Sequence, residues 1–345
     1  MKLPLVSVPN ETLGWSGGDS YLTNLKLALG ELQDEKRIKI LPKHQDWLVE
    51  RYPFRPRARI TNEFEISPNL SNVAFLPWAP IRRLPRPLIW IPDLQDKDMP
   101  LMFPRSEVIS RDRSRRIAIL KNARFYFSSR TMERRFIEIY PKAVSVGIVR
   151  FAFRNSTPSD SISNLNLEID NGFFYAPNQF WKHKNHFTLL EAFKRYRESG
   201  GTQDLVLSGN TLDPRWPNHS NDILSIASET EGVHSLGFIP RSHQMSLYSN
   251  SSAVIQPSLY EGWSSSVEEA LSFGLRVISA DIPVLREQNQ NIEGVRFFDP
   301  FDIVSLSRLM HETPPLNSIR TGEIGGARWT RFKSDLHEMI MNYLQ

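Results

Sequence analysis

The feature that most constrains the fold is the stretch from residue 253 to residue 278, in which short apolar runs flank a polar turn and a helical segment. Its segments are, in order, a buried strand ending at Gln256, an irregular turn over 257–266, a helix over 267–273 stopped by Gly274, and a second strand at Val277-Ile278. This order is typical of an α/β unit, in which ligands bind at the strand ends.

The turn in this stretch has the composition of a phosphate site. One glycine and three serines lie where the helix opens: Gly262, Ser264, Ser265 and Ser266. A helix that opens on small polar residues presents unpaired backbone N–H groups and the positive end of its dipole. Glu261 and Glu269 bracket the turn, and ionised carboxylates accept short hydrogen bonds from a sugar diol. The stretch therefore predicts a site for a phosphorylated sugar or a nucleotide.

Length and composition bound what this stretch belongs to. With 345 residues, of which 40% are hydrophobic, the chain supports two ordinary domains. The absence of cysteine excludes disulfides and a thiolate nucleophile, and it agrees with a reducing cytoplasm. Residues 1–10 are too short and too interrupted by proline for a signal peptide, and no apolar run approaches the roughly 18 residues of a membrane helix. We expect a soluble, cytoplasmic protein.

Charge is distributed unevenly between the two halves. Residues 1–155 contain 27 Lys and Arg against 16 Asp and Glu, whereas the remainder contains 15 against 22. Arginine clusters over 51–59, 82–86 and 111–116 suit an anionic membrane surface or a phosphorylated acceptor, and ordinary solvated faces are the alternative. Nucleic acid is disfavoured because no recognition motif accompanies the charge. Peripheral contact with the inner face of a membrane is one expectation.

Two loops in the first half carry candidate ligand contacts. A predicted strand over 3–8 leads through a turn over 14–20 that contains Gly17 and Gly18, which allow close approach to a ligand, a plain tight turn being the alternative. A second predicted strand, 88–91, ends in a loop with three carboxylates, Asp93, Asp96 and Asp98. The acid-x-acid pair in this loop imitates a metal site, but solvated loop acids are the favoured interpretation, and we expect no metal.

The rest of the chain alternates between strand and helix patterns. Expected strands and helices follow one another over 105–149 and again over 172–249, and a polar segment over 155–169 separates the two series as a linker. Such alternation predicts parallel sheets covered by helices. Apolar residues at helical spacing over 329–344 predict a last, core-facing helix.

The chain resembles the retaining glycosyltransferases of family 4, which have a GT-B fold: two Rossmann-like domains with parallel sheets that face each other across a cleft. The similarity is strongest over 172–288, and Glu261 and Glu269 match the family's E-x7-E signature. Weaker similarity covers residues 14–18, 90–95 and the charged helix around Arg111. The resemblance implies an acceptor-side domain over 1–165, a nucleotide-sugar domain over 166–328, and a helix over 329–345 that packs back on the first domain.

The resemblance also implies roles for particular residues. Glu269 would hold the ribose hydroxyls of a sugar nucleotide, and Glu261 would lie near the donor sugar. Backbone amides around Gly262 and the three serines would cradle the diphosphate. Lys184 corresponds to the family's phosphate-binding lysine, whose charge stabilises the departing nucleoside diphosphate. The alternative for Glu261 is an acid of an ordinary turn, and the alternative for Glu269 is a solvated acid of a helix. The alternative for Lys184 is a surface lysine without a ligand.

Two departures from the family pattern concern catalysis. Gln179 stands where the family commonly has a second phosphate-binding arginine, so we expect this side chain to contact the donor as a neutral group. The family's histidine in the first domain has no counterpart, because only His44 precedes residue 183 and its context matches no family motif. Asp93 or Asp96 is the candidate to accept the proton of the acceptor hydroxyl instead. The pair His183 and His186 imitates a metal patch, but a strand-to-helix turn explains it better.

We therefore expect a metal-independent, hexosyl-type transferase that moves a sugar from a nucleoside diphosphate sugar to a glycan or lipid-linked acceptor, in the synthesis of a bacterial surface polysaccharide. The donor is a substrate, and no cofactor is expected. One alternative is a non-catalytic subunit that binds nucleotide sugars and supports a partner transferase. Another is a sugar-nucleotide epimerase of the same fold, for which no acid-base set is found in the sequence.

Overall fold

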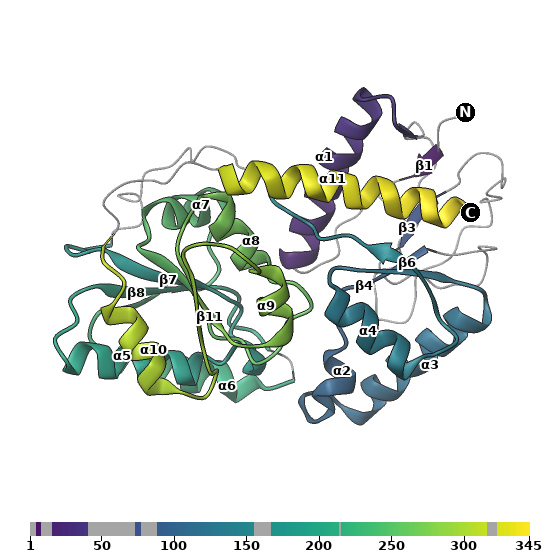
Figure 1. The fold of residues 1–345 in the computed structure, drawn as a ribbon. Helices are drawn as coiled ribbons and strands as arrows, with labels where there is room; N and C mark the ends of the chain where they lie inside the picture. The colour runs from purple at the N-terminus through teal and green to yellow at the C-terminus, as the bar shows by residue number, and fades with distance from the viewer. Residues whose placement is uncertain are drawn as a thin grey trace. The chain divides into compact units, whose positions relative to one another are not determined.

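The computed structural model describes residues 5–7, 16–40, 73–76, 88–154, 167–213, 215–315 and 323–345. The chain divides into an N-terminal unit, Met1–Phe151 with Arg328–Gln345, and a C-terminal unit, Ala152–Ala327 (Figure 1). The first segment of the N-terminal unit thus ends at Phe151. The sequence placed the domain boundary later, at residue 165. Both units are α/β, with parallel sheets, as the sequence predicted. No helix in the described ranges is long and apolar enough to cross a membrane.

The sheet of the N-terminal unit is parallel throughout, with the order β2-β1-β3-β4-β5-β6. Its strands are β1 (Leu5–Ser7), β2 (Lys39–Ile40), β3 (Val73–Leu76), β4 (Leu88–Ile91), β5 (Arg124–Phe127) and β6 (Val144–Ile148). All four residues of β4 are buried, which is what a strand covered on both faces requires.

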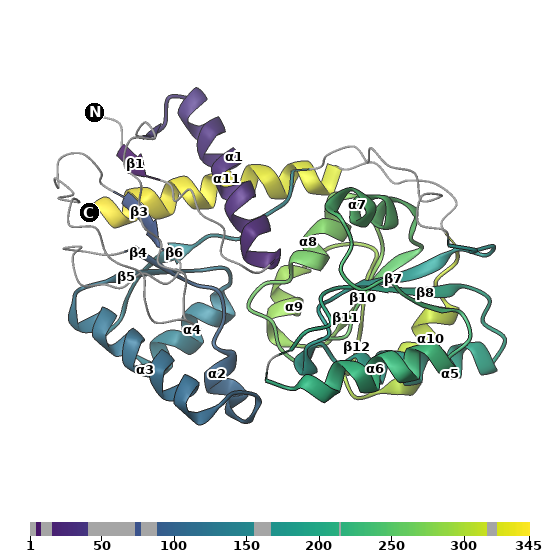
Figure 2. The same cartoon turned by 180° about the vertical axis from the view of Figure 1, so that it is seen from behind.

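Helices lie on both sides of this sheet (Figures 1 and 2). One side carries α1 (Ser16–Asp34) and α11 (Glu323–Leu344), and the other carries α2 (Gln95–Asp98), α3 (Arg105–Leu120) and α4 (Arg130–Ile139). A single 3-10 turn, η1 (Pro100–Met102), connects α2 to α3. Because α1 begins at Ser16, Gly17 and Gly18 lie in the first turn of a helix and not in a turn that precedes it.

The last helix belongs with the N-terminal unit through specific contacts. Trp329, Phe332, Leu336 and Ile340 are buried, as their helical spacing predicted. The Trp329 indole N–H donates to Glu31 Oε2 at 3.0 Å, and Arg150 donates to both carboxylate oxygens of Asp335 at 2.9 Å. Apolar burial of this kind contributes about 1.5–3 kcal/mol for each large side chain.

The sheet of the C-terminal unit is also parallel, with the order β12-β11-β10-β7-β8-β9. Its strands are β7 (Phe173–Pro177), β8 (Asp204–Ser208), β9 (Val233–Ser235), β10 (Ala253–Gln256), β11 (Val277–Ala280) and β12 (Val295–Phe298). Its helices are α5 (His186–Glu198), α6 (Pro217–Glu229), α7 (Arg241–Asn250), α8 (Ser265–Ser272), α9 (Pro283–Gln288) and α10 (Ile303–His311). α5, α6 and α10 cover one face of the sheet, and α7 and α8 cover the other (Figures 1 and 2).

The strand order of the C-terminal unit locates its ligand site. The chain builds outward from β7 through β8 to β9, and then returns to the other side of β7 to build β10, β11 and β12. The point between β7 and β10 is therefore the topological switch point of a Rossmann-type sheet. Ligands bind outside the carboxyl ends of the strands at such a point. The loops that follow β7 and β10 are consequently the ones to inspect.

Candidate functional site

The loops after β7 and β10 are joined by an ion pair. Lys184 ends the 3-10 turn η3 (Lys182–Lys184) in the first loop, and Glu261 lies in the second. Lys184 Nζ is 2.5 Å from Glu261 Oε1, and the two side chains are 15% and 9% exposed. The structure thus brings together two residues that the sequence placed in one site from separate motifs.

A glutamine holds the Glu261 carboxylate in place. Gln256, the last residue of β10, is fully buried, and its Nε2 donates to Glu261 Oε1 at 2.6 Å and to Ser258 Oγ at 2.9 Å. Glu261 Oε1 therefore accepts from both Lys184 and Gln256. No sequence motif pointed to Gln256 as part of the site. Its only signal is a polar residue at the carboxyl end of an otherwise apolar strand.

The first turn of α8 contains unpaired backbone donors. Ser264 caps the helix, because its hydroxyl accepts from the Val267 N–H at 3.3 Å. The Ser264 N–H donates to Gln288 Oε1 at 3.0 Å, so this amide is already paired. The amides of Ser265 and Ser266 have no hydrogen-bond partner among the described residues. Fewer backbone amides are therefore left unpaired than the sequence predicted, and they are those of Ser265 and Ser266.

Gln288 of α9 braces the same turn. It is buried, and its Nε2 donates to the Ser264 carbonyl at 2.8 Å and to Glu268 Oε1 at 3.0 Å. The Ser266 hydroxyl donates to the Pro177 carbonyl at 2.9 Å, which ties the start of α8 to the end of β7. These bonds fix the first turn of α8 to β7 and α9. No sequence motif pointed to Gln288.

Glu269, the predicted ribose ligand, is paired with an arginine. Arg241 Nη1 is 2.7 Å from Glu269 Oε1, and the Arg241 guanidinium also lies over the Phe153 ring at 5.4 Å. Burial raises the pKa of Tyr248 well above its ordinary value, and the nearby Glu269 carboxylate adds to this shift. Tyr248 therefore remains protonated beside Glu269. A diol that binds Glu269 has to share or replace the Arg241 contact.

The loop after β7 contains buried polar groups. Gln179 occupies the position of the family's arginine, so no second cation stands there. Its neighbour Asn178 is buried, and neither polar atom of its side chain has a hydrogen-bond partner in the described part of the chain. Gly209, with a φ of 157°, packs so closely that an added Cβ would lie 2.2 Å from the Asn178 carbonyl oxygen. Only glycine fits there.

Two histidines of this loop are buried and neutral. Burial lowers the pKa of His186 to about 3 and lowers the pKa of His183 well below its usual range. The His186 ring stacks on Phe180 with a centroid distance of 4.7 Å. Among the residues that the structure describes, no group of three or more His, Asp or Glu side chains is arranged to hold a metal ion. The histidines thus pack the loop that carries Lys184.

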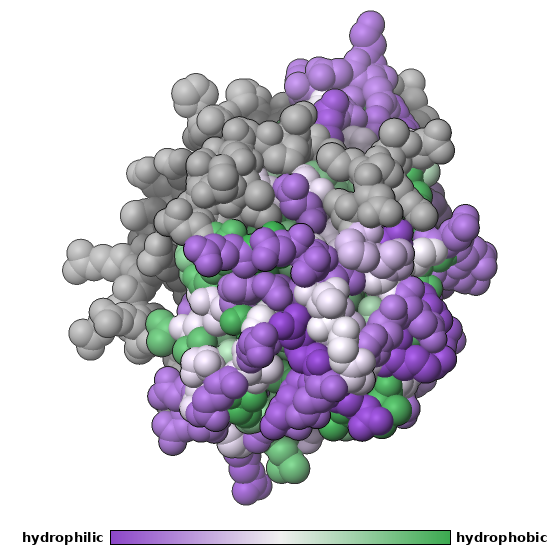
Figure 3. Space-filling view, turned by 90° about the vertical axis from the view of Figure 1, so that its left-hand side faces the viewer, coloured by the Kyte–Doolittle hydropathy of each residue, from purple (hydrophilic) through white to green (hydrophobic). Residues whose placement is uncertain are grey.

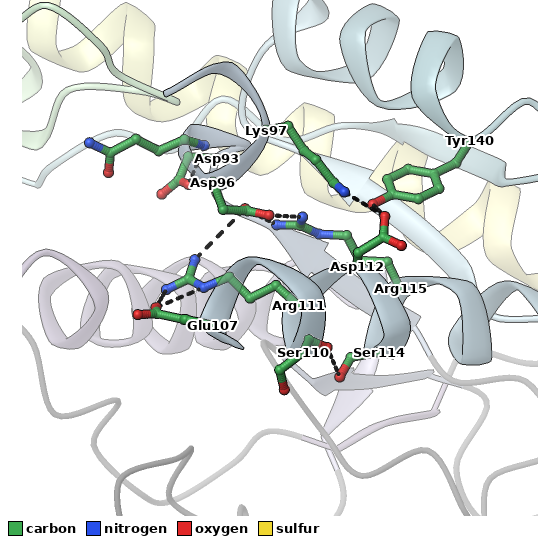
Figure 4. A network of polar contacts seen from close by, with 11 residues as sticks. Asp93, Asp96, Lys97, Glu107, Ser110, Arg111, Asp112, Ser114, Arg115 and Tyr140 are labelled. Carbon is green, nitrogen blue, oxygen red and sulfur yellow. Dashed lines mark hydrogen bonds and ion pairs between the residues drawn. The ribbon is translucent and has the colours of Figure 1, made fainter. Parts of the chain in front are cut away.

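The predicted carboxylates of the N-terminal unit lie in a network of ion pairs (Figure 4). Asp96 is fully buried, and Arg115 Nη1 and Nη2 each donate to one of its carboxylate oxygens at 2.7 Å. Asp98 instead accepts from Arg135 Nε at 2.8 Å. The geometry favours a structural role for Asp96, because both its oxygens are occupied and shielded. The acid-x-acid pair therefore contacts arginines on two different helices.

Asp93 differs from Asp96 in accessibility. It is half-buried, and its Oδ1 accepts from the Gln95 N–H at 3.1 Å (Figure 4). Asp93 therefore keeps one carboxylate oxygen that is not bonded to the described residues. His44 and the arginine clusters over 51–59 and 82–86 lie outside the described residues.

A second ion-pair group anchors α3 in the same network. Asp112 accepts from Lys97 at 2.5 Å and from the Tyr140 hydroxyl at 2.7 Å (Figure 4). It also accepts from Arg116 at 2.7 Å. Burial alone would raise the pKa of Asp112, but these three donors outweigh it and hold the pKa well below its usual range. Asp112 therefore stays ionised and fixes α3 to α2 and α4.

Part of the chain is similar in sequence to known proteins. Residues 160–313 match the family model described as glycosyl transferases group 1. Glycosyltransferase 1 domain-containing protein 1 of Xenopus tropicalis is 26% identical over 137 residues, which cover 39% of this chain and 38% of that protein. This chain therefore matches little more than a third of that relative's length.

Solved structures extend the likeness to the whole fold. Sucrose-phosphate synthase from Thermosynechococcus elongatus aligns with a TM-score of 0.64 and 14% identity over 99% of this chain and 94% of its own. The apo structure of OtsA aligns with a TM-score of 0.53 and 10% identity over 80% of this chain and 71% of its own. These likenesses show an α/β fold of the GT-B kind, and the residues that match the family model include Lys184, Glu261 and Glu269.

Proposed function

We propose that the protein is a retaining glycosyltransferase that moves a hexosyl group from a nucleoside diphosphate sugar to a hydroxyl of a glycan or lipid-linked acceptor. One observation carries the proposal. The Lys184–Glu261 ion pair joins the two loops at the switch point of the C-terminal sheet, next to a helix start with two unpaired amides. A cation, anion-binding amides and a carboxylate in one place suit a diphosphate linked to a sugar.

The donor is assigned to the C-terminal unit. The diphosphate binds Lys184 and the amides of Ser265 and Ser266, with Gly262 giving close access to the turn. Glu269 accepts the ribose hydroxyls once Arg241 yields part of its contact. Gln179 offers an amide where the family has a second cation. The base and the sugar of the donor are left to experiment.

The chemistry rests on stabilising the leaving group. As the bond from the sugar to the diphosphate breaks, negative charge grows on the diphosphate oxygens. Lys184 and the positive end of α8 are already in place to balance this charge, and fixed donors of this kind lower the barrier more than mobile water does. No resident metal is given a role. The acceptor attacks on the face that the diphosphate leaves, which retains the configuration.

The acceptor side is assigned to the N-terminal unit. Asp93 is the preferred group to accept the proton of the acceptor hydroxyl, because it is half-buried and has a free oxygen. Asp96, which the sequence also offered, positions the loop through Arg115. Gly17 and Gly18 contribute backbone amides at the start of α1. We place the reaction in the cytoplasm, at the membrane surface, in the synthesis of a bacterial surface polysaccharide.

A second candidate is a subunit that binds nucleotide sugars without transferring them. Two observations favour it: Gln179 replaces a cation that the family uses, and Asp96 is locked in an ion pair. In that case the donor site is intact and the N-terminal unit supplies no proton acceptor. The two candidates agree on donor binding and differ in turnover.

One assay tests both candidates. The protein is incubated with a panel of sugar nucleotides, with and without glycan and lipid-linked acceptors, and release of nucleoside diphosphate is measured. Release that Lys184→Ala abolishes and Lys194→Ala leaves unchanged supports the transferase, since Lys194 is an exposed lysine of α5 in the same unit. Binding without release in every mixture favours the subunit. If the protein shows no binding and no release with any sugar nucleotide, the donor site itself is overturned.

A further inference from the structure

The outward face of α3 exposes large aliphatic side chains that the fold does not bury. Ile109 is 57% exposed, Ile117 is 39% exposed and Leu120 is 85% exposed. Leu101, in the turn just before this helix, is 90% exposed. A single exposed leucine is ordinary, but four such side chains on one helix and the turn that leads into it form a patch that suggests a partner.

Arginines share this face. Arg105 and Arg113 are exposed, and the side chain of Arg116 is 63% exposed. The positions 105, 109, 113, 116, 117 and 120 recur every three or four residues, so they line one side of a helix. Both acids of α3, Glu107 and Asp112, are part-buried and ion-paired. The face is therefore aliphatic and positive together.

The opposite side of α3 is fixed to the rest of the N-terminal unit. Arg115 is buried in its two bonds with Asp96, and Arg111 pairs with Glu107 at 2.7 Å while its guanidinium lies over Phe103 (Figure 4). The sequence grouped the arginines over 111–116 as one cluster, and this is wrong for Arg115, which faces the interior. The ion pairs hold the helix so that its aliphatic and basic face points outward.

One other face of the molecule looks different. The face drawn in Figure 3 is mainly hydrophilic among its coloured residues, and the hydrophobic residues there form small scattered groups. That is the usual pattern of a protein surface in water. The aliphatic side chains of α3, by contrast, alternate with arginines along a single helix.

We propose that this face of α3, together with Leu101, binds the surface of a membrane that contains anionic lipids. The aliphatic side chains enter the boundary between headgroups and acyl chains, and the arginines contact lipid phosphates, as in helices that lie in a membrane interface. Charge complementarity selects this occupant. A second copy of the same face would set arginines against arginines, and a nucleic acid would gain little from the aliphatic groups. The surface is independent of the donor site, and it suits a lipid-linked acceptor.

Vesicle flotation tests the proposal without any need for sugar transfer. The full chain is mixed with vesicles of phosphatidylcholine or of phosphatidylcholine with phosphatidylglycerol. We expect flotation with the anionic vesicles and little with the neutral ones. Two variants address the face: Ile109→Ser with Leu120→Ser, and Arg105→Glu with Arg113→Glu. Each should lower the partition coefficient roughly tenfold or more. Circular dichroism and the melting temperature verify that both variants fold.

Matched controls lie on the C-terminal unit. Val304→Ser removes a side chain that is also exposed, and Lys194→Glu with Arg195→Glu makes the same change in net charge on α5. Both controls should float like the unchanged protein. Equal flotation with neutral and anionic vesicles, or equal loss in the controls and the α3 variants, would overturn the proposal. Self-association that the α3 substitutions abolish, without vesicle binding, would assign the face to a second copy instead.

Discussion

The two units each contain an acid and a cation in or beside a loop at the carboxyl end of a strand, yet the two pairs differ in kind. Asp96 and Arg115 are both buried and share two hydrogen bonds, one to each carboxylate oxygen. Lys184 and Glu261 share one contact, are partly exposed, and lie beside unpaired amides. The first pair stabilises the fold of its unit, and we propose the second as part of the donor site. Exposure and the number of bonds, more than residue type, separate the two.

Breaking the buried pair should have the largest effect. Arg115→Ala leaves the Asp96 carboxylate buried without its partner, which costs about 3–5 kcal/mol of unfolding free energy. Chemical denaturation measures this loss. Arg113→Ala, on the exposed side of the same helix, should change stability by less than about 0.5 kcal/mol. Equal stability of the two variants would show that the buried pair is not structural.

Removing the exposed cation should instead reduce activity. Lys184→Ala removes the charge that balances the leaving diphosphate, so we expect turnover to fall about 10²–10³-fold. The unfolding free energy should change far less than in Arg115→Ala, because Lys184 and Glu261 are partly solvated. Nucleoside diphosphate release and denaturation, measured on the same preparation, check both expectations. A large loss of stability with unchanged turnover per folded molecule would show that Lys184 has a structural role and not a catalytic one.

Acid should destabilise the loop that carries Lys184. The pKa of His186 is about 3 in the folded protein against 6.5 for the free side chain. Between these values the unfolded chain binds more protons, so stability is complete above about pH 6.5 and falls toward pH 3, by up to about 1.4 kcal/mol per pH unit. Denaturation midpoints between these pH values measure the slope. His186→Phe should reduce the slope by the contribution of His186 and leave that of the buried His183. An unchanged slope would place the titrating group elsewhere.

The smallest effect is expected when a cation is added to the loop after β7. Gln179→Arg restores the cation that the family has at this position. We expect turnover or donor affinity to rise by about tenfold at most, because Lys184 and α8 already supply most of the positive charge. Steady-state kinetics with the preferred donor measures the change. A fall in both parameters would mean that the loop has repacked around the neutral side chain.

Much of the fold, and the position of one loop of the candidate site, could be predicted from the sequence. The alternation of strands and helices specified two parallel sheets, and the spacing of Glu261 and Glu269 located the turn after β10. These signals are local, because hydrophobic period, glycines and small polar turns act within a few residues. The likeness of residues 160–313 to the glycosyltransferase family model agrees with the same stretch.

The supporting contacts were not predictable, for physical reasons. Gln256, Gln288 and Arg241 act on groups from other segments, and a single polar residue in a strand or a short helix has no period to reveal it. Asp96 looked like a solvated loop acid because its partner is 19 residues away on a helix rich in charge. Whether such a charge faces water or the interior depends on the packing of the whole unit.

A crystal structure with a bound sugar nucleotide tests the proposed donor site most directly. We expect the diphosphate to lie within hydrogen-bond distance of Lys184 Nζ and of the Ser265 and Ser266 amides, and the ribose hydroxyls to contact Glu269. A diphosphate bound away from the loops that follow β7 and β10, with the Lys184–Glu261 pair untouched, would show that the donor site lies elsewhere.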